Sequence, residues 1–266
     1  MRRHWISIRK GLLIIGLPLL MAILLRLLCF DTYKIPSTSM TPTLIPGDFI
    51  LVSKLNYGTR LLKVRQFFKN GKNEYIRVKG FNPIKRGDLV VFNWPNYNYV
   101  NDSTQDMFGI VIVKRCCGIP GDTVMIKDDG TSIEGNPKQQ QKDELFPHDS
   151  TFKWTINNYG PLFVPGKGLS IQLTNKNIRL YKDILAYEGV KLSIQGDSVF
   201  HNKKYVPNYT FKNNYYFMKG DNFYGSMDSR YWGFVPESNV IGKTIMVLFS
   251  DGVDGFQWNR LFHTTS

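Results

Sequence analysis

The chain has 266 residues and a net charge of +13, with 42% hydrophobic and 21% charged residues. These proportions are ordinary for a globular protein and exclude a disordered chain. Aromatic residues make up 14%, and 23 glycines with 13 prolines favour strands and turns over long helices. The positive charge does not indicate nucleic acid binding, because beyond the N-terminal segment the cations are scattered, with no Arg-rich helix or zinc-finger spacing. A basic surface beside anionic membrane lipid fits this distribution better.

Residues 11–30, GLLIIGLPLLMAILLRLLCF, form an apolar run whose one charge, Arg26, lies near its end. A helix of this length, at about 1.5 Å per residue, spans the hydrocarbon core of a membrane. Cations crowd residues 1–10 and Asp31 follows the run, so we expect a single-pass anchor with a cytoplasmic N-terminus and the remaining chain outside. A cleaved signal peptide is the alternative; however, the run is long for one and no A-x-A-like site follows it.

After the anchor, short alternating or apolar runs recur between turn signals such as Pro46-Gly47-Asp48 and Pro120-Gly121-Asp122. This pattern is typical of an all-β domain with long connections. The predicted strands are 48–53, 88–93, 108–114, 123–127, 169–173, 191–195, 215–218 and 244–249. A short helix is expected within 175–188, and the polar stretch 127–155 is interpreted as an inserted loop.

The first segment with chemical potential is 35–44, IPSTSMTPTL, shortly after the apolar run. Three hydroxyls stand between two prolines, which stiffen the backbone and prevent a helix, so a hydroxyl here is presented rather than buried. Taken alone, the segment is better explained as an ordinary polar linker next to the membrane.

The second segment, 109–115 (GIVIVKR), places Lys114 at the end of a β-branched run. In a strand, Lys114 shares a face with Ile110 and Ile112, and apolar surroundings lower the pKa of a lysine toward neutrality. A neutral lysine can take a proton from a serine. The alternative is a strand-end lysine that points into water.

The third segment is 218–236, MKGDNFYGSMDSRYWGFVP, in which Asp228 and Arg230 can pair on one face of an extended stretch. On physical grounds alone, a polar loop with a surface ion pair explains it as well.

In this order, the three segments closely resemble the bacterial type I signal peptidase family. PSTSMTPTL followed by PGD resembles the serine box of that family, and RGDLVVF at 86–92 resembles the next box. VKR with GIPGD at 113–122 resembles the lysine box, and GDN with DSRYWG at 220–233 resembles the final box. The sequence departs from the family at 223–225, where FYG stands in place of a segment that usually begins with arginine. The spacing to the following serine is preserved.

The resemblance implies a serine protease with a Ser–Lys dyad, in which Ser39 is the nucleophile and Lys114 the general base. The Ser37 hydroxyl and the Ser39 backbone N–H would form the oxyanion hole. Ser226 would hydrogen-bond Lys114 and orient it. The implied reaction removes signal peptides from translocated preproteins after small, Ala-X-Ala-like residues, through an acyl-enzyme.

The resemblance also implies a structural pair, Asp228 with Arg230, near the site. The substrate would lie extended beside the lysine strand. The residues that would contact it are Ile35, Pro36, Met40, Ile112 and Val113. No metal or cofactor is expected. The expected partners are preprotein signal peptides and membrane lipids but no nucleic acid, and the expected state is a monomer.

The expected fold is mostly β: an N-terminal transmembrane helix, then a large antiparallel β-sheet catalytic domain with a second β subdomain. The expected parts are 1–10, cytoplasmic; 11–30, anchor; 31–126, first part of the catalytic domain; 127–210, inserted variable subdomain; and 211–266, last part of the catalytic domain. The expected location is the bacterial inner membrane with the catalytic domain in the periplasm, and a Gram-positive surface stays open.

Two other functions are consistent with parts of the sequence. A self-cleaving repressor-type peptidase uses the same Ser–Lys chemistry but needs a DNA-binding head, where this chain has an apolar helix. A membrane-anchored β-domain with an inactive dyad would only bind, and peptide turnover in detergent separates it from the enzyme.

Overall fold

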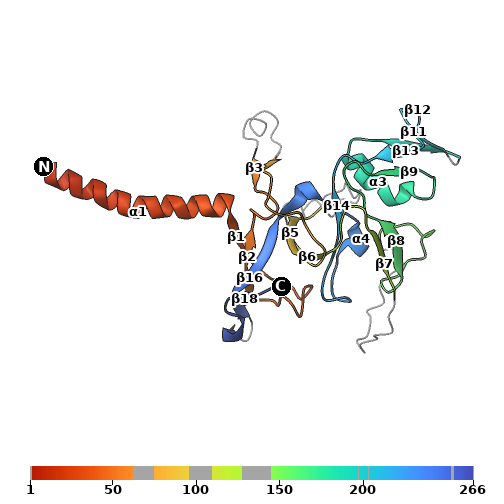
Figure 1. Cartoon of the computed structure of the whole chain (residues 1–266). Coiled ribbons are helices and arrows are strands. Elements are labelled where there is room, and N and C mark those ends of the chain that lie inside the picture. The colour runs from red at the N-terminus through yellow and green to blue at the C-terminus, as the bar shows by residue number, and fades with distance from the viewer. Residues whose placement is uncertain are drawn as a thin grey trace. The chain divides into compact units, whose positions relative to one another are not determined.

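Antiparallel strands account for most of the regular structure in the computed structural model (Figure 1), which describes residues 2–62, 75–95, 110–127, 145–196, 198–202, 204–252 and 255–265. The chain divides into two units whose segments alternate along the sequence. The first unit comprises Met1–Ile35, Gly47–Pro83 and Ile241–Ser266, and the second comprises Pro36–Pro46 and Ile84–Val240. The mostly β, antiparallel fold class is thus confirmed, while the expected domain boundaries stay a prediction.

Helix α1 (Arg2–Leu28) covers most of the expected anchor and leads into strand β1 (Phe30–Lys34) (Figure 1). The predicted segment 11–30 runs past the end of this helix, because Phe30 already pairs with Ser53 of the next strand. The side chains of residues 14–28 are exposed. Within the described residues, no helix combines the length and the apolarity needed to cross a membrane.

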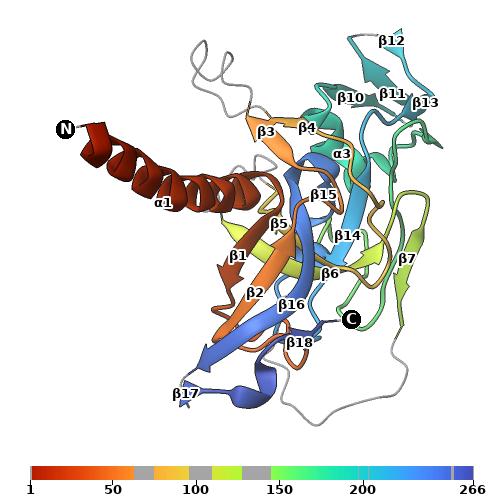
Figure 2. The same cartoon turned by 60° about the vertical axis from the view of Figure 1, so that its left-hand side comes forward.

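The first unit is built around three neighbouring antiparallel strands, β1, β2 (Asp48–Ser53) and β16 (Val240–Gly252), which lie side by side in Figure 2. Strands β17 (Gly255–Phe256) and β18 (His263–Thr264) pair with β16, and β3 (Arg60–Leu62) pairs with β4 (Tyr75–Arg77). The predicted strand 48–53 is confirmed at both ends. The predicted strand 244–249 is only the middle of β16, which continues across two irregularities in its pairing with β2.

The second unit contains four antiparallel strands in the order β5 (Leu89–Asn93), β6 (Val111–Gly118), β14 (Tyr215–Lys219) and β15 (Val235–Pro236). Strand β6 differs from its prediction, 108–114, because it continues to Gly118. The extension occurs because Arg115, Cys116 and Gly118 pair with β14. Lys114 is therefore in the middle of a strand rather than at its end.

The described part of the second unit also contains smaller sheets and helix α3. The pairs are β7 (Thr123–Ile126) with β8 (Tyr159–Phe163), β9 (Ser170–Gln172) with β13 (Asn208–Thr210), and β10 (Leu192–Gln195) with β11 (Ser198–His201), which also pairs with β12 (Lys204–Tyr205). Helix α3 (Ile178–Tyr187) confirms the short helix expected within 175–188. Its buried Ile178, Tyr181 and Leu185 recur at helical spacing and pack into the core of this unit.

The predicted inserted loop, 127–155, lies partly outside the described residues, which resume at Leu145. There, the interpretation as a polar loop is wrong in part, because Leu145 and Phe146 are 7% and 3% exposed. The Phe146 ring contacts the Phe234 ring edge-on, with centroids 5.8 Å apart. These two apolar residues anchor the end of the segment in the core.

Candidate active site

Ser39 and Lys114, which are 75 residues apart in the chain, meet in the second unit. Strand β6 carries Lys114 opposite Val90 of β5, and its Nζ donates a hydrogen bond to Ser39 Oγ at 2.6 Å. Lys114 is 3% exposed. Burial lowers the pKa of its ammonium from 10.5 to about 8, although the carboxylates of Asp228 and Asp221 act in the opposite direction. A neutral amine at this distance can accept the Ser39 proton.

The serine segment is held in place by its apolar side chains. Met40 and Leu44 are 1% and 0% exposed, and Leu44 N–H donates to the Met40 carbonyl at 3.0 Å. Ser39, next to this anchor, is half-buried, and Ser37 is exposed. Their hydroxyl oxygens are 3.4 Å apart, so both side chains face the same space. This geometry agrees with the expectation that the hydroxyl is presented rather than buried.

Arg115 of β6 and Asp221, in the loop after β14, both hydrogen-bond the serine segment at Thr43. Asp221 accepts two hydrogen bonds from Arg115, at 2.7 and 2.6 Å, and one from Thr43 Oγ1 at 2.6 Å. Burial would raise the pKa of the Asp221 carboxyl, but these donors hold it below its ordinary value. Sequence reasoning assigned neither residue a role, because nothing in the chain's local pattern connects two residues so far apart.

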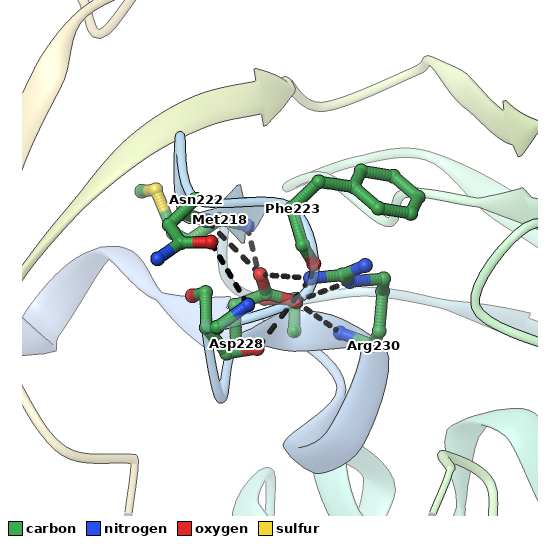
Figure 3. A network of polar contacts seen from close by, with 9 residues as sticks. Met218, Asn222, Phe223, Asp228 and Arg230 are labelled. Atoms are coloured by element: carbon green, nitrogen blue, oxygen red, sulfur yellow. Dashed lines mark hydrogen bonds and ion pairs between the residues drawn. The ribbon is translucent and has the colours of Figure 1, made fainter. Parts of the chain in front are cut away.

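Asp228 and Arg230 form an ion pair whose side chains are both 0% exposed, so the surface-pair alternative is wrong. Figure 3 shows the carboxylate facing the guanidinium, with Nε and Nη2 both 2.8 Å from its oxygens. Asp228 has an extended backbone and caps the short helix α4 (Ser229–Trp232), and it also accepts from Gly220 N–H at 3.0 Å. Arg230 lies within that helix, so the two residues do not share one face of an extended stretch as predicted. The Phe223 carbonyl accepts from Arg230 at 2.6 Å, and its ring lies 4.6 Å from the guanidinium.

Ser226 is buried, and within the part of the chain that the structure describes its hydroxyl has no hydrogen-bond partner. The expected hydrogen bond from Ser226 to Lys114 is therefore not formed here. Ser226 Oγ instead lies against Gly220, where a Cβ would be only 2.0 Å from it and 2.5 Å from the Ser39 carbonyl oxygen. The absence of a side chain at Gly220 thus allows Ser226 and the serine segment to pack against it.

Gly220→Ala is expected to lower activity roughly 10- to 100-fold, because the added methyl group must displace Ser226 or the Ser39 backbone, and small displacements at a reacting group are costly. Gly168→Ala is a control, since a Cβ there meets nothing within 4 Å, although its φ of 81° brings some strain. Peptide turnover, together with the unfolding midpoints of both variants, measures the effect. Full activity in Gly220→Ala would contradict the conclusion that a side chain at position 220 displaces Ser226 or the Ser39 backbone.

The expected substrate-contacting residues differ in their exposure. Pro36 is exposed and Ile112 is half-buried, whereas Ile35, Val113 and Met40 are 5%, 8% and 1% exposed. Met40 acts chiefly as an anchor of the serine segment in this structure, and a contact with substrate stays a prediction for all five.

A serine hydroxyl hydrogen-bonded to a buried lysine of lowered pKa is a site equipped for nucleophilic catalysis without histidine. The chain belongs to the signal peptidase family, peptidase S26, whose model matches residues 8–249. The resemblance seen in the four sequence boxes is thereby confirmed.

Curated relatives agree with the family assignment. Signal peptidase I of Buchnera aphidicola subsp. Acyrthosiphon pisum is 32% identical over 256 residues, which cover 91% of this chain and 75% of the relative. The protein of the same name from Buchnera aphidicola subsp. Baizongia pistaciae is 30% identical over 249 residues, covering 86% and 73%. Signal peptidase I of Haemophilus influenzae is 28% identical over 274 residues, covering 90% and 70%.

Proposed function

We propose that this chain is a membrane-bound serine endopeptidase that removes N-terminal signal peptides from translocated preproteins, cleaving after small, Ala-X-Ala-like residues. The observation that carries the proposal is the 2.6 Å hydrogen bond between Lys114 Nζ and Ser39 Oγ. Membership in the signal peptidase family supports the reaction and the substrate class.

In the proposed mechanism, neutral Lys114 takes the proton of Ser39 Oγ while that oxygen attacks the scissile carbonyl carbon. The Ser39 N–H and the Ser37 hydroxyl donate to the oxyanion that forms. The protonated lysine then gives its proton to the leaving amine, and an acyl-enzyme remains. Lys114, neutral again, activates the water that hydrolyses the ester. Ser226 would orient Lys114 if its hydroxyl turned to hydrogen-bond the Lys114 amine.

The edge of β6 supports binding of an extended substrate. Its residues Val111–Lys114 pair with β5 on one side, whereas the ladder with β14 involves only Arg115–Gly118. Among the described residues, the first half of β6 thus lacks a second strand partner, and an extended peptide can add there by main-chain hydrogen bonds. Ile110 and Val111 are 42% and 36% exposed and offer apolar contacts beside this edge.

Anchoring in a membrane is part of the proposal. Helix α1 exposes apolar side chains such as Ile14, Leu17 and Leu27, at 72%, 65% and 60%, and a lipid environment would cover them. We place residues 11–28, the apolar part of α1, in a bacterial inner membrane as a single pass, with the N-terminus cytoplasmic and the catalytic part on the periplasmic side. The enzyme would contact lipids and act as a monomer.

The test is cleavage of a purified preprotein by the detergent-solubilised protein, with the N-terminus of the product read by mass spectrometry. We expect cleavage after an A-x-A-like site by the wild type and by the exposed-serine control Ser150→Ala, but not by folded Ser39→Ala. A wild type that cuts no preprotein sinks the proposal and favours the binding domain. Cleavage only of its own chain favours the self-cleaving peptidase.

A further inference from the structure

Asn222, in the loop after β14, hydrogen-bonds two consecutive carbonyls of the serine segment. Its side-chain Nδ2 donates to the Thr38 carbonyl at 3.2 Å, and its backbone N–H donates to the Ser39 carbonyl at 3.2 Å. No role for Asn222 follows from the sequence. Its two contacts reach the peptide groups immediately before and after the Ser39 side chain.

The first of these contacts bears on the Ser39 N–H. The Thr38 carbonyl and the Ser39 N–H belong to one planar peptide group, so fixing the direction of the C=O fixes the opposite direction of the N–H. The Thr38 carbonyl also accepts from Thr41 N–H at 3.0 Å, but this donor belongs to the same segment and moves with it. Asn222 donates to the same carbonyl from outside the serine segment, so it fixes the peptide group relative to the rest of the unit.

The orientation of the Asn222 amide is determined by a third contact. Its Oδ1 accepts from Gly225 N–H at 3.0 Å, and a backbone N–H can only donate, so the NH₂ group must face Thr38. A Cβ on Gly225 would lie 2.5 Å from Asn222 Nδ2, so the absence of a side chain at 225 leaves room for the amide. Figure 3 shows Asn222 beside the Asp228–Arg230 pair.

The Ser39 N–H itself has no hydrogen-bond partner within the described part of the chain. A backbone donor that is oriented from outside but unoccupied is available to a ligand oxygen. We propose that Asn222 is a positioning residue that orients the Ser39 N–H toward the oxyanion. The inference rests on the proposed function, since that mechanism assigns the N–H to the oxyanion.

The experiment compares Asn222→Ala with Asn177→Ala, a matched control. The side-chain amide of Asn177 makes the same two kinds of hydrogen bond away from the site. Its Oδ1 accepts from Thr174 N–H at 2.8 Å, and its Nδ2 donates to the Gln172 carbonyl at 2.7 Å. Losing one oxyanion donor typically costs about 100- to 1,000-fold in turnover, so misaligning one should lower kcat about 10- to 100-fold, with KM changed less than about twofold. Gly225→Ala, which displaces the amide, should act in the same direction.

Two peptide inhibitors separate positioning from a general loss of structure. A substrate-like peptide aldehyde forms a hemiacetal: Ser39 Oγ bonds to the aldehyde carbon, the carbonyl π electrons move to its oxygen, and the Oγ proton goes to Lys114. The same peptide ending in an alcohol forms no such adduct. We expect Asn222→Ala to weaken the binding of the aldehyde about tenfold or more and to leave the binding of the alcohol unchanged. Unchanged binding of both inhibitors, or equal weakening of both, would overturn the inference.

A crystal structure of folded Asn222→Ala tests the inference even if the proposed function fails. Failure of the function appears as a wild type that neither cuts a preprotein nor binds the aldehyde. In that case the Thr38–Ser39 peptide should still be rotated or doubled in the variant, and a peptide plane identical to the wild type would overturn the positioning role.

Discussion

Replacing Lys114 with methionine is expected to lower kcat for preprotein cleavage by about 100- to 10,000-fold, the range that general bases contribute. Methionine keeps an apolar side chain of similar length in the buried position of Lys114, but it has no amine to accept the proton of Ser39 Oγ. Lys167→Met, at an exposed position, is the control and should retain full activity. Turnover of a labelled peptide in detergent measures the effect, and a Lys114→Met variant that cuts at a comparable rate would exclude Lys114 as the base.

The activity of the wild type should rise with pH around the pKa of Lys114, because only the neutral amine accepts a proton. With that pKa lowered to about 8 by burial, activity should be low at pH 6 and approach a plateau above pH 9. A flat profile of kcat/KM across this range would contradict a lysine base.

The same lysine should cost stability. The folded chain holds Lys114 at a pKa of about 8 against 10.5 ordinarily, so between these values the unfolded chain binds more protons and stability rises with pH. Below about pH 8 both states are protonated and the penalty is fully present. At pH 7, Lys114→Met should therefore have a free energy of unfolding about 1–3 kcal/mol higher than the wild type, and it should unfold at a higher temperature. The Lys167→Met control should not.

Removing one partner of the buried ion pair has the second large effect. Arg230→Met is expected to lower the free energy of unfolding by about 3–5 kcal/mol, because it leaves the fully buried Asp228 carboxylate without its cation. Activity should fall with it, since Asp228 also binds the N–H of Gly220, beside Ser226 and the Ser39 carbonyl. Urea unfolding followed by fluorescence gives the free energy.

The chain offers a matched control for this ion pair. Arg179 pairs with Asp149 at 2.6 Å, but the arginine side chain is 42% exposed. Arg179→Met should cost only about 0–1 kcal/mol, as exposed pairs do. Combining Arg230→Met with Asp228→Asn should recover part of the loss, because no unpaired charge remains. Equal losses for both arginine variants would mean that burial does not determine the strength of the Asp228–Arg230 pair.

The sequence by itself determined the class of the fold and the likeness of the site to a family. Strand 48–53 and the helix within 175–188 were predictable because period and turn residues are local properties. Ser39, Lys114, Asp228 and Arg230 stood out because short boxes occur in a set order. A local pattern also showed that Lys114 lies in an apolar run, but that pattern left open whether its side chain is buried or points into water. Only the structure shows that it is 3% exposed.

Only the tertiary structure decided which atoms meet. Strand β6 extends beyond its prediction because β14 pairs with its second half, and Arg115 reaches Asp221 across 106 residues. The hydroxyl of Ser226 faces Gly220 rather than forming the expected bond to Lys114. Asn222 gained a role only through its contacts with the serine segment. Periodicity tells which face of an element is buried, but the partner of a polar group depends on how distant segments pack, and the local sequence does not encode that packing.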